Sequence, residues 1–286
     1  MLHGYTPPER YLPYLSWTQI TQLPDPANTV IVLPAGATEQ HGPHLPCSVD
    51  TAICAGVIGH ALARLPKHVP AYAMAPITYG KSEEHLHFPG TMTLTGTTLL
   101  ATMIELGDSV YRSGFRKLLI VNGHGGQPQV MEMAARELRL RYGDFVVIPT
   151  SVWKMPSGSA AFTSDKEKKL SMHAGHGETA LMLALAPETV HMELAVANFP
   201  PEFPSKLLSP DGRPACAWTT LDFGPTGVIG DPCGATPEQG QIILESLSSH
   251  WAQAIEEVHQ LNWVKRHEPT WGRGHQTGHI QKSPLP

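Results

Sequence analysis

Short apolar segments alternate with longer amphipathic segments along the first two-thirds of this chain of 286 residues. The short segments are rich in aliphatic and β-branched residues and predict buried strands, whereas the longer ones carry apolar residues at helical spacing. Such alternation is typical of a parallel sheet covered by helices on both faces. We therefore expect a single α/β domain over residues 1–263 with a mostly parallel sheet. Strands are expected at 29–33, 70–78, 117–121 and 145–148, and helices at 51–65, 96–112, 126–141, 178–184 and 236–261.

Two segments depart from this pattern. Residues 200–237 are rich in Pro, Gly and Asp and predict either an ordered excursion near the functional site or a subunit contact. Residues 264–286 have scattered Gly, Pro and His and are expected to form a disordered tail. The longest apolar runs, such as 180–186, are far shorter than the ~20 residues that a membrane helix needs. Residues 1–17 contain prolines and Glu9 where a secretory signal needs an apolar stretch, so we expect none.

Composition narrows the function classes further. A net charge of −5 with 16% charged residues offers no basic surface for nucleic acid, and 41% hydrophobic residues exclude global disorder. The four cysteines lack the spacing of a zinc knuckle or a disulfide framework, so reduced thiols and a cytoplasmic location are expected. Histidine is unusually common, with 16 residues against 20 Lys and Arg.

Many of these histidines follow predicted strands, and ligands of parallel sheets gather at the carboxyl ends of strands. After the first strand, Glu39 and His41 are two residues apart and project to one side of an extended backbone, and Asp50 follows at a helix start. These side chains could bind a divalent metal. Alternatively, Asp50 is only a helix cap, and Glu39 and His41 are ordinary loop residues. His44 is expected to support the structure or contact a ligand rather than bind metal.

Three further segments repeat the association of histidine with strand or helix ends. His124 lies among glycines after the third strand, where it could be a ligand or part of a tight turn, and a phosphate cradle is only weakly indicated. Glu178 follows His173 and His176 and could complete a second metal site or act only as a favourable first-turn charge. In the segment 79–91, Ser82 and His85 are expected to line a pocket, Glu83 and Glu84 to face solvent, and His87 to hold a turn.

Carboxylates and imidazoles recur at several separate strand ends. Together they indicate a functional site more strongly than any one of them does alone. Five of these side chains form a ligand set for two divalent ions with one bridging carboxylate, as in dinuclear hydrolytic sites. They are Glu39, His41, Asp50, His124 and Glu178.

The order of these motifs resembles the creatininase (creatinine amidohydrolase) family over roughly residues 16–260. The resemblance implies an α/β fold, two divalent ions (Zn or Mn, with Fe as a further option), hydrolysis of an amide C–N bond and commonly a homohexamer. The motifs are Glu39-Gln40-His41-Gly42-Pro43-His44 with Asp50, His87-Phe88-Pro89-Gly90-Thr91, Asn122-Gly123-His124, 178–185 and Gly227-Val228-Ile229-Gly230-Asp231-Pro232 with Ala235, Thr236 and Glu238.

The same resemblance implies residue roles. Glu39, Asp50 and His124 would hold one metal, and His41 with the shared Asp50 would hold the other. His173 matches the catalytic histidine, whereas Trp153 and Ser82 match substrate-contacting positions.

The chain departs from creatininase proper at two places. Gly125 and Gly126 stand where creatininase has Tyr and a metal-binding Glu, and residues 169–172 contain no aromatic lid. Members with two glycines take the missing carboxylate from the position of Glu178, which is present here.

We therefore expect a metal-dependent amidohydrolase acting on a cyclic amide such as creatinine, or on a related small amide. Metal-activated water would attack the carbonyl, backbone N–H groups near Gly125 would help to stabilise the oxyanion, and His173 would carry a proton to the leaving nitrogen. The expected partners are a small-molecule amide and further copies of the chain, with neither nucleic acid nor membrane. The expected substrate contacts are Ser82, His85, Gly125, Gly126 and Trp153.

Two alternatives stay open. The first is a formamide hydrolase for a formamidopyrimidine nucleotide-like substrate, with Gly125 and Gly126 receiving its phosphate or ribose. Only Lys81 supplies a basic group near a motif, which mildly favours a small neutral substrate. The second is a metal-stabilised scaffold without activity, which is disfavoured because each expected ligand position holds a competent ligand.

Overall fold

A parallel sheet lies at the centre of the computed structural model, which describes residues 2–200, 204–205, 207–210 and 214–262. Within these residues the sheet has four strands in the order β2-β1-β3-β4, and each neighbouring pair is parallel. This confirms the expected parallel α/β sheet. The strands are β1 (Val30–Ala35), β2 (Ala71–Ala73), β3 (Lys117–Asn122) and β4 (Val146–Ser151).

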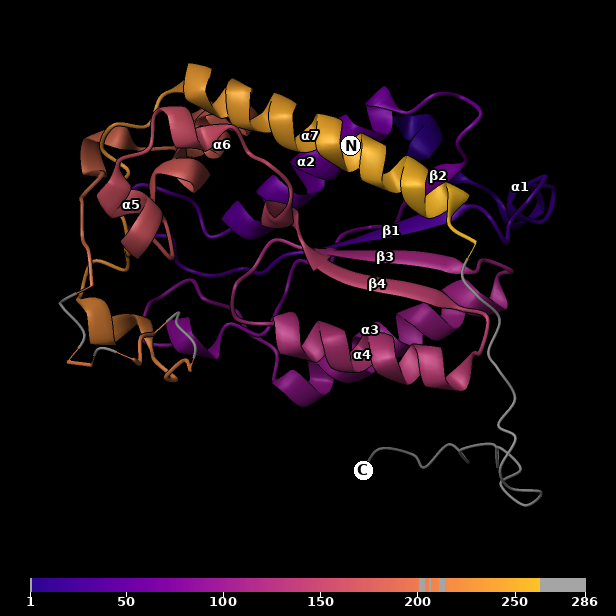
Figure 1. The fold of residues 1–286 in the computed structure, drawn as a ribbon, viewed down its shortest axis with the longest axis horizontal. Helices are drawn as coiled ribbons and strands as arrows, with labels where there is room; N and C mark the ends of the chain where they lie inside the picture. Colours follow the sequence, from indigo (N-terminus) through magenta and orange to yellow (C-terminus); the bar gives the residue numbers. More distant parts are fainter. Residues whose placement is uncertain (1, 201–203, 206, 211–213, 263–286) are drawn as a thin grey trace.

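Alternate side chains of β1 enter two separate cores, because successive residues of a strand point to opposite faces. Val30 and Val32 pack with α2 (Val49–Arg64), α6 (His176–Leu185) and α7 (Pro237–Gln260). Figure 1 shows these helices together on one side of the sheet.

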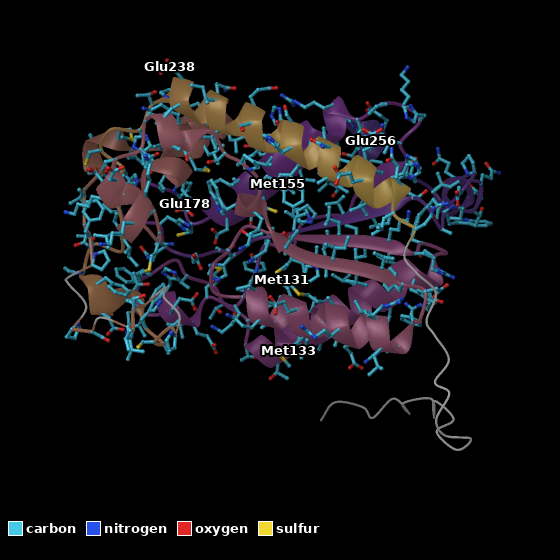
Figure 2. The ribbon with its side chains drawn as sticks, viewed as in Figure 1. Met131, Met133, Met155, Glu178, Glu238 and Glu256 are labelled. Carbon is cyan, nitrogen blue, oxygen red and sulfur yellow. The ribbon has the colours of Figure 1, made fainter. Side chains whose placement is uncertain are left out.

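The opposite face of the sheet is covered by α3 (Gly96–Arg112) and α4 (Pro128–Arg141), which pack on Ile31 and Leu33. Figure 2 shows Met131 of α4 pointing toward the sheet and Met133 pointing outward. Met131 is buried, whereas Met133 is 57% exposed. The three layers are those that helical and strand periodicity predict. Two short helices lie outside these layers, namely α1 (Trp17–Thr21) and α5 (Asp165–Leu170).

Helix α7 approaches α6 closely at Gly240, where a Cβ atom would overlap the carbonyl group of Ala180. Helix α7 is capped by Thr236, whose hydroxyl accepts from Gln239 N, and the predicted helix at 236–261 agrees with it to within one residue at each end. The sequence also predicts the bounds of α3, which is capped by Thr95.

Three helix starts differ from the prediction by two residues, and that of α7 differs by one. Helix α2 begins at Val49 after Ser48, so Asp50 lies inside the first turn rather than at the cap. Helix α4 begins at Pro128, which suits a first turn because proline has no N–H to leave unpaired there. Helix α6 begins at His176, so Glu178 is also a first-turn residue.

Strand β2 is shorter than the predicted 70–78 because Pro76 cannot donate to a ladder. Pairing with β1 resumes beyond it, where Ile77 N donates to the Pro34 carbonyl and Gly36 N to the Ile77 carbonyl. The chain therefore stays beside the end of β1 as it enters the segment of Ser82 and His85.

The described part of 200–237 lies against the remainder of the fold. Its short 3-10 helix η8 (Thr220–Phe223) buries Thr220, and Gly230 pairs with Asn198. This agrees with an ordered excursion near the site, and the predicted tail at 264–286 lies outside the described residues. Within the described ranges no helix combines the length and hydropathy that crossing a membrane requires. All four cysteines are free thiols.

Candidate metal centre

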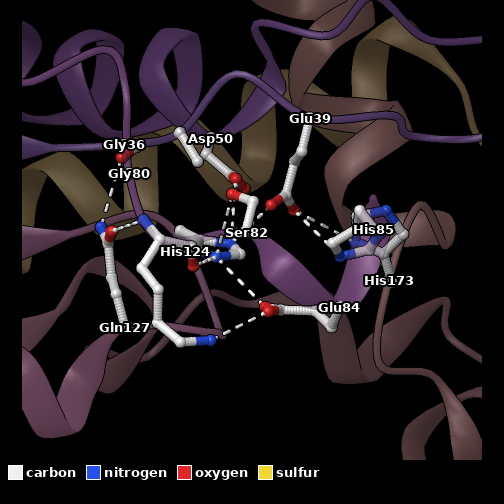
Figure 3. A network of polar contacts seen from close by, with 12 residues as sticks. Gly36, Glu39, Asp50, Gly80, Ser82, Glu84, His85, His124, Gln127 and His173 are labelled. Carbon is white, nitrogen blue, oxygen red and sulfur yellow. Dashed lines mark hydrogen bonds and ion pairs between the residues drawn. The ribbon is translucent and has the colours of Figure 1, made fainter. Parts of the chain in front are cut away.

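Four loops meet beyond the carboxyl ends of the strands, and each brings a predicted site residue. Glu39 and His41 follow β1, His85 closes the 3-10 helix η3 (Glu83–His85) after β2, and His124 follows β3. His173 enters from the segment before α6. Figure 3 shows the carboxylates and imidazoles from these loops directed toward one another.

Asp50 lies between two imidazoles and offers one carboxylate oxygen to each. Its Oδ1 is 3.4 Å from His41 Nε2, and its Oδ2 is 3.3 Å from His124 Nδ1. Glu39 Oε2 approaches the same His124 Nδ1 at 3.1 Å. The structure thus brings these four predicted ligands together, all of them buried, and Asp50 contacts both imidazoles.

Several atoms in this cluster are buried without a hydrogen-bond partner. Among the described residues these include Glu39 Oε2, His41 Nε2 and Asp50 Oδ2. A buried polar group left unpaired costs about 1–3 kcal/mol, and more when it is charged. Three such atoms on residues that face one another fit the binding of a cation.

The hydrogen bonds of the histidines lead to the same inference. Backbone carbonyl oxygens lie 3.1 Å from His41 Nδ1, 2.8 Å from His124 Nε2 and 2.7 Å from His173 Nε2. A carbonyl oxygen can only accept, so each of these nitrogens carries the proton and the other nitrogen of a neutral ring has a lone pair.

The lone pairs of His41 and His124 then face carboxylate oxygens, which are acceptors as well. Only a positive charge between such groups makes the arrangement favourable, either a second proton on each ring or a divalent cation. Imidazole and carboxylate are the ligands that zinc and related metals use. The residues present therefore fit divalent metal ions.

The pKa values of the site residues also indicate that positive charge is stabilised between them. Burial alone would lower the pKa of His41, but the carboxylates of Asp50, Glu178 and Glu39 raise it to about 9. Burial also opposes the charged form of His124, yet Glu39 and Asp50 raise its pKa well above the usual value. The Asp50 pKa is lowered, because these imidazoles outweigh its burial.

Glu178 and His173 form the other side of the cluster. Ligand atoms of His41, His173 and Glu178 all lie within 4.8 Å of one another. Burial raises the pKa of Glu178 to about 7, and burial with the nearby His41 lowers that of His173 well below 6.5. Ala174 between them has a left-handed φ of 55°, and its N–H donates to Glu178 Oε2 at 2.6 Å. A strained alanine at this point is typical of a functional loop.

The prediction that Glu84 faces solvent is wrong. Its Oε1 lies 3.3 Å from His124 Nε2, and its Oε2 lies 3.3 Å from Lys81 Nζ. A Cβ atom on Gly126 would overlap the Glu84 carboxylate, so Glu84 occupies the space that a side chain at 126 would take. The pair of glycines after His124 was the available signal, because it leaves room for a carboxylate from another loop. Glu83 is exposed, as expected.

The other predicted pocket residues surround this cluster at different depths. Ser82 and His85 are buried: Ser82 Oγ is 3.4 Å from His124 Nε2, and His85 Nε2 is 3.4 Å from Glu39 Oε1. Gly125 is exposed, with no atom within 4 Å of a Cβ placed there. Trp153 is partly buried, and its ring is 3.9 Å from a Cβ placed on Gly177, beside Glu178.

His44, His87 and His176 lie outside the cluster of possible ligands. His44 is fully buried and bonds to the Thr179 hydroxyl at 2.9 Å, and burial lowers its pKa to about 4. His176 bonds to Gln239 Oε1 at 2.9 Å. His87 is exposed.

A family model described as "Creatininase: Creatinine amidohydrolase" matches residues 13–255. A mycofactocin precursor peptide peptidase from Mycolicibacterium smegmatis is 33% identical over 229 residues, which are 79% of this chain and 84% of that protein. A creatinine amidohydrolase from Pseudomonas putida is 32% identical over 269 residues, covering 85% of this chain and 95% of that protein.

Solved structures of creatininases share the fold. A mutant creatininase in complex with creatine has a TM-score of 0.70 and 29% identity, covering 86% of this chain and 97% of its own. Two related structures are described as a Zn-Zn type of a creatininase mutant and as a creatininase with Mn.

Proposed function

This chain belongs to the creatininase family of metal-dependent hydrolases, and we propose that its buried cluster hydrolyses the C–N bond of a small amide. The observation that carries the proposal is the set of unpartnered atoms Glu39 Oε2, His41 Nε2 and Asp50 Oδ2 on side chains that face one another. These groups are the ones that a catalytic divalent cation requires.

The proposed ligands fall on two sides of Asp50. Glu39 and His124 would share one metal with Asp50, and His41 and Glu178 would share the second with it. Zinc and manganese are the proposed ions, supported by the metals named for two creatininase structures. When bound, such ions lower the pKa of a water molecule toward neutrality and polarise a carbonyl group.

His173 is the proposed proton carrier. Its Nε2–H donates to the Gln40 carbonyl, so Nδ1 is the nitrogen free to take a proton and pass it to the leaving nitrogen. A neutral resting state suits this task, and burial provides it by lowering the pKa of His173.

Backbone N–H groups near Gly125 are the proposed donors to the oxyanion, since this residue faces open space beside His124. Ser82, His85, Gly126 and Trp153 are proposed to shape the substrate pocket.

A second candidate substrate is an amide bond of a peptide. Relatives named as peptide peptidases are 33–36% identical to this chain, and residues 169–172 carry no aromatic side chain that could cover a compact ligand. The open space at Gly125 also supports a substrate that extends out of the site.

The nucleotide-like formamide is the less favoured alternative. Lys81 is the basic residue nearest the motifs, and its Nζ lies 3.4 Å from Glu83 and 3.3 Å from Glu84. An ammonium group already paired with two carboxylates is poorly placed to bind a phosphate.

Metal analysis and a substrate screen test the proposal. The purified protein, reconstituted with Zn²⁺, Mn²⁺ or Fe²⁺, is assayed with creatinine, other cyclic amides and lactams, formamides and short peptides. We expect bound metal and hydrolysis of creatinine, another cyclic amide or lactam, or a formamide. Hydrolysis of short peptides would instead support the second candidate substrate. Bound metal without hydrolysis of any of these substrates would favour the scaffold alternative, and absence of both metal and hydrolysis would overturn the proposal of a metal-dependent hydrolase.

Two further expectations concern the oligomeric state and the location of the protein. We propose a homohexamer, in line with the family resemblance, which light scattering of the purified protein would measure. A cytoplasmic location stays a prediction that the free thiols support.

A further inference from the structure

The two carboxylate oxygens of Glu39 have different surroundings. Oε2 lies 3.1 Å from His124 Nδ1 and has no hydrogen-bond partner. Oε1 points to the other side and lies 3.4 Å from His85 Nε2. Whether His85 donates to this oxygen or competes for a metal depends on which of its ring nitrogens carries the proton.

The side-chain amide of Gln40 answers that question. Its Oε1 accepts from Gly42 N at 2.9 Å, and its Nε2 donates to the Gly227 carbonyl at 3.1 Å, so backbone groups fix which end of the amide is which. The same Nε2 lies 2.8 Å from His85 Nδ1. An amide nitrogen can only donate, so Nδ1 of His85 is an acceptor and its proton is on Nε2.

The remaining contact of Gln40 Nε2 is with His173 Nε2 at 3.2 Å. That ring nitrogen already donates to the Gln40 carbonyl at 2.7 Å. This contact is therefore between two donors, and both amide hydrogens are left for Gly227 and His85.

Thr220 reinforces the arrangement from the segment 200–237, whose role the sequence leaves open. Its hydroxyl is buried, lies 2.8 Å from His85 Nδ1 and lies 3.1 Å from the Glu84 carbonyl. Asp222 caps the short helix η8 by accepting from Thr219 N at 2.6 Å, which holds the neighbouring Thr220 in place. Its single hydroxyl hydrogen is donated to the Glu84 carbonyl, so Thr220 contacts the His85 ring while Gln40 remains the donor to Nδ1.

We infer that Gln40 is a positioning residue that makes His85 a hydrogen-bond donor to Glu39 Oε1, so that Oε2 alone is presented to the metal. His85 then orients a ligand instead of being one. The inference rests on the metal site proposed above and assigns a task to the excursion, whose Gly227 carbonyl fixes the Gln40 amide.

Zinc affinity of the full-length apoprotein tests the inference, measured by calorimetry in competition with a chelator. Loss of a group that orients a metal ligand typically weakens binding by roughly 10–100-fold. We expect this loss in Gln40→Met and in His85→Phe. Thr220→Val should lose at most a few-fold, because Gln40 still donates to Nδ1 in this variant.

Conservative and remote variants separate positioning from general damage. Thr220→Ser keeps the hydroxyl and is expected to bind Zn²⁺ as the wild type does. Thr102→Val removes a hydroxyl that donates to the Thr98 carbonyl within α3 and should leave zinc affinity unchanged. Circular dichroism and thermal unfolding of each apoprotein check that the fold is retained.

The tautomer of His85 provides a readout that a structural role would not move. In ¹⁵N-histidine spectra, the signals that the zinc-loaded wild type shows and His85→Phe lacks belong to His85. These signals should show the proton on Nε2. A proton on Nδ1, or zinc bound to Nε2, would overturn the inference, and so would wild-type affinity in both Gln40→Met and His85→Phe.

The proposed hydrolysis can fail separately from this inference. If the wild type binds zinc with the expected variant pattern but cleaves no amide, the positioning role stands and the amidohydrolase proposal does not. If amides are cleaved while the variants bind zinc normally, the amidohydrolase proposal stands and the positioning role does not.

Discussion

His173 donates its Nε2–H to the backbone carbonyl oxygen of Gln40 at 2.7 Å, and its Nδ1 faces Glu39 Oε1 at 3.8 Å. One nitrogen is therefore committed to the backbone while the other is directed into the cluster. His41 and His124 follow the same rule with the carbonyls of Glu39 and Lys81. Three imidazoles thus present a lone pair to the site because backbone geometry holds their protons elsewhere.

Replacing His173 with alanine is expected to retain the bound metal and to abolish most turnover. Glu39, His41, Asp50 and His124 keep their mutual contacts in this variant, whereas the proton carrier is lost, and general acid–base groups contribute roughly 10²–10⁴-fold to rates. Metal content by mass spectrometry and turnover of the substrate found in the screen measure the two effects.

His191→Ala is a suitable control, since this exposed histidine pairs with Glu193 away from the cluster. Loss of metal from His173→Ala would show instead that this residue is a ligand, consistent with its position near His41 and Glu178. Unchanged turnover would exclude the proton-carrier role.

Adding a methyl group at Gly126 is expected to weaken metal binding, whereas the same change at Gly125 should not. A Cβ at Gly126 would overlap the Glu84 carboxylate and lie close to His124 Nε2, so both side chains must shift. A Cβ at Gly125 meets nothing within 4 Å. Zinc titration of the two apoproteins compares them directly. Equal affinity of Gly126→Ala and Gly125→Ala would show that Glu84 and His124 can move without cost.

Local pattern was sufficient to predict the sheet and most residues of the cluster, Glu84 excepted. Strands such as Val30–Ala35 are continuous apolar runs, and parallel strands bring their carboxyl ends together, so Glu39 and His124 had to become neighbours once the strands were recognised. Helix starts were predicted less well, because Val49 and His176 begin their helices through tertiary packing rather than through a strong capping residue.

The orientation of individual side chains could not be predicted from the sequence. Glu83 and Glu84 are adjacent carboxylates of the same type, yet the turn of η3 exposes one and directs the other to His124. The contact of Thr220 with His85 joins positions 135 residues apart, and no local periodicity encodes such a pair. Hydrogen-bond donors fixed by distant backbone groups, as in Gln40, are visible only in three dimensions.

Asp50→Asn is expected to cause the largest loss of metal among single substitutions. Asp50 offers one oxygen to His41 and one to His124, so the amide would remove a charge from both sides and place an N–H donor against one imidazole. Metal analysis after dialysis should find less metal than in His173→Ala. Asp25→Asn, at a site where the carboxylate bonds to Asn28, is the matched control and should keep the wild-type content. Full metal content in Asp50→Asn would exclude a bridging role.

The stability of the metal-free protein should fall as the pH rises from 7 to 9. Folded His41 has a pKa of about 9 against a usual 6.5, so in this interval the folded state binds more protons than the unfolded state. The free energy of unfolding then decreases with pH, because its slope follows the protons bound by the unfolded state minus those bound by the folded state. His124, whose pKa is also raised, acts in the same direction. Urea unfolding at pH 7, 8 and 9 in the presence of a chelator measures the slope.

Zinc should remove this slope and bind more tightly at higher pH, because the metal replaces protons on His41, His124 and Glu178. Glu178, with a pKa of about 7 raised by burial, contributes at the lower end of the interval. His41→Gln is expected to flatten the slope of the metal-free protein, whereas His191→Gln, a change at an exposed site, should preserve it. A metal-free protein whose stability is constant or rises from pH 7 to pH 9 would show that the imidazoles of the cluster are not held protonated by Asp50 and Glu39.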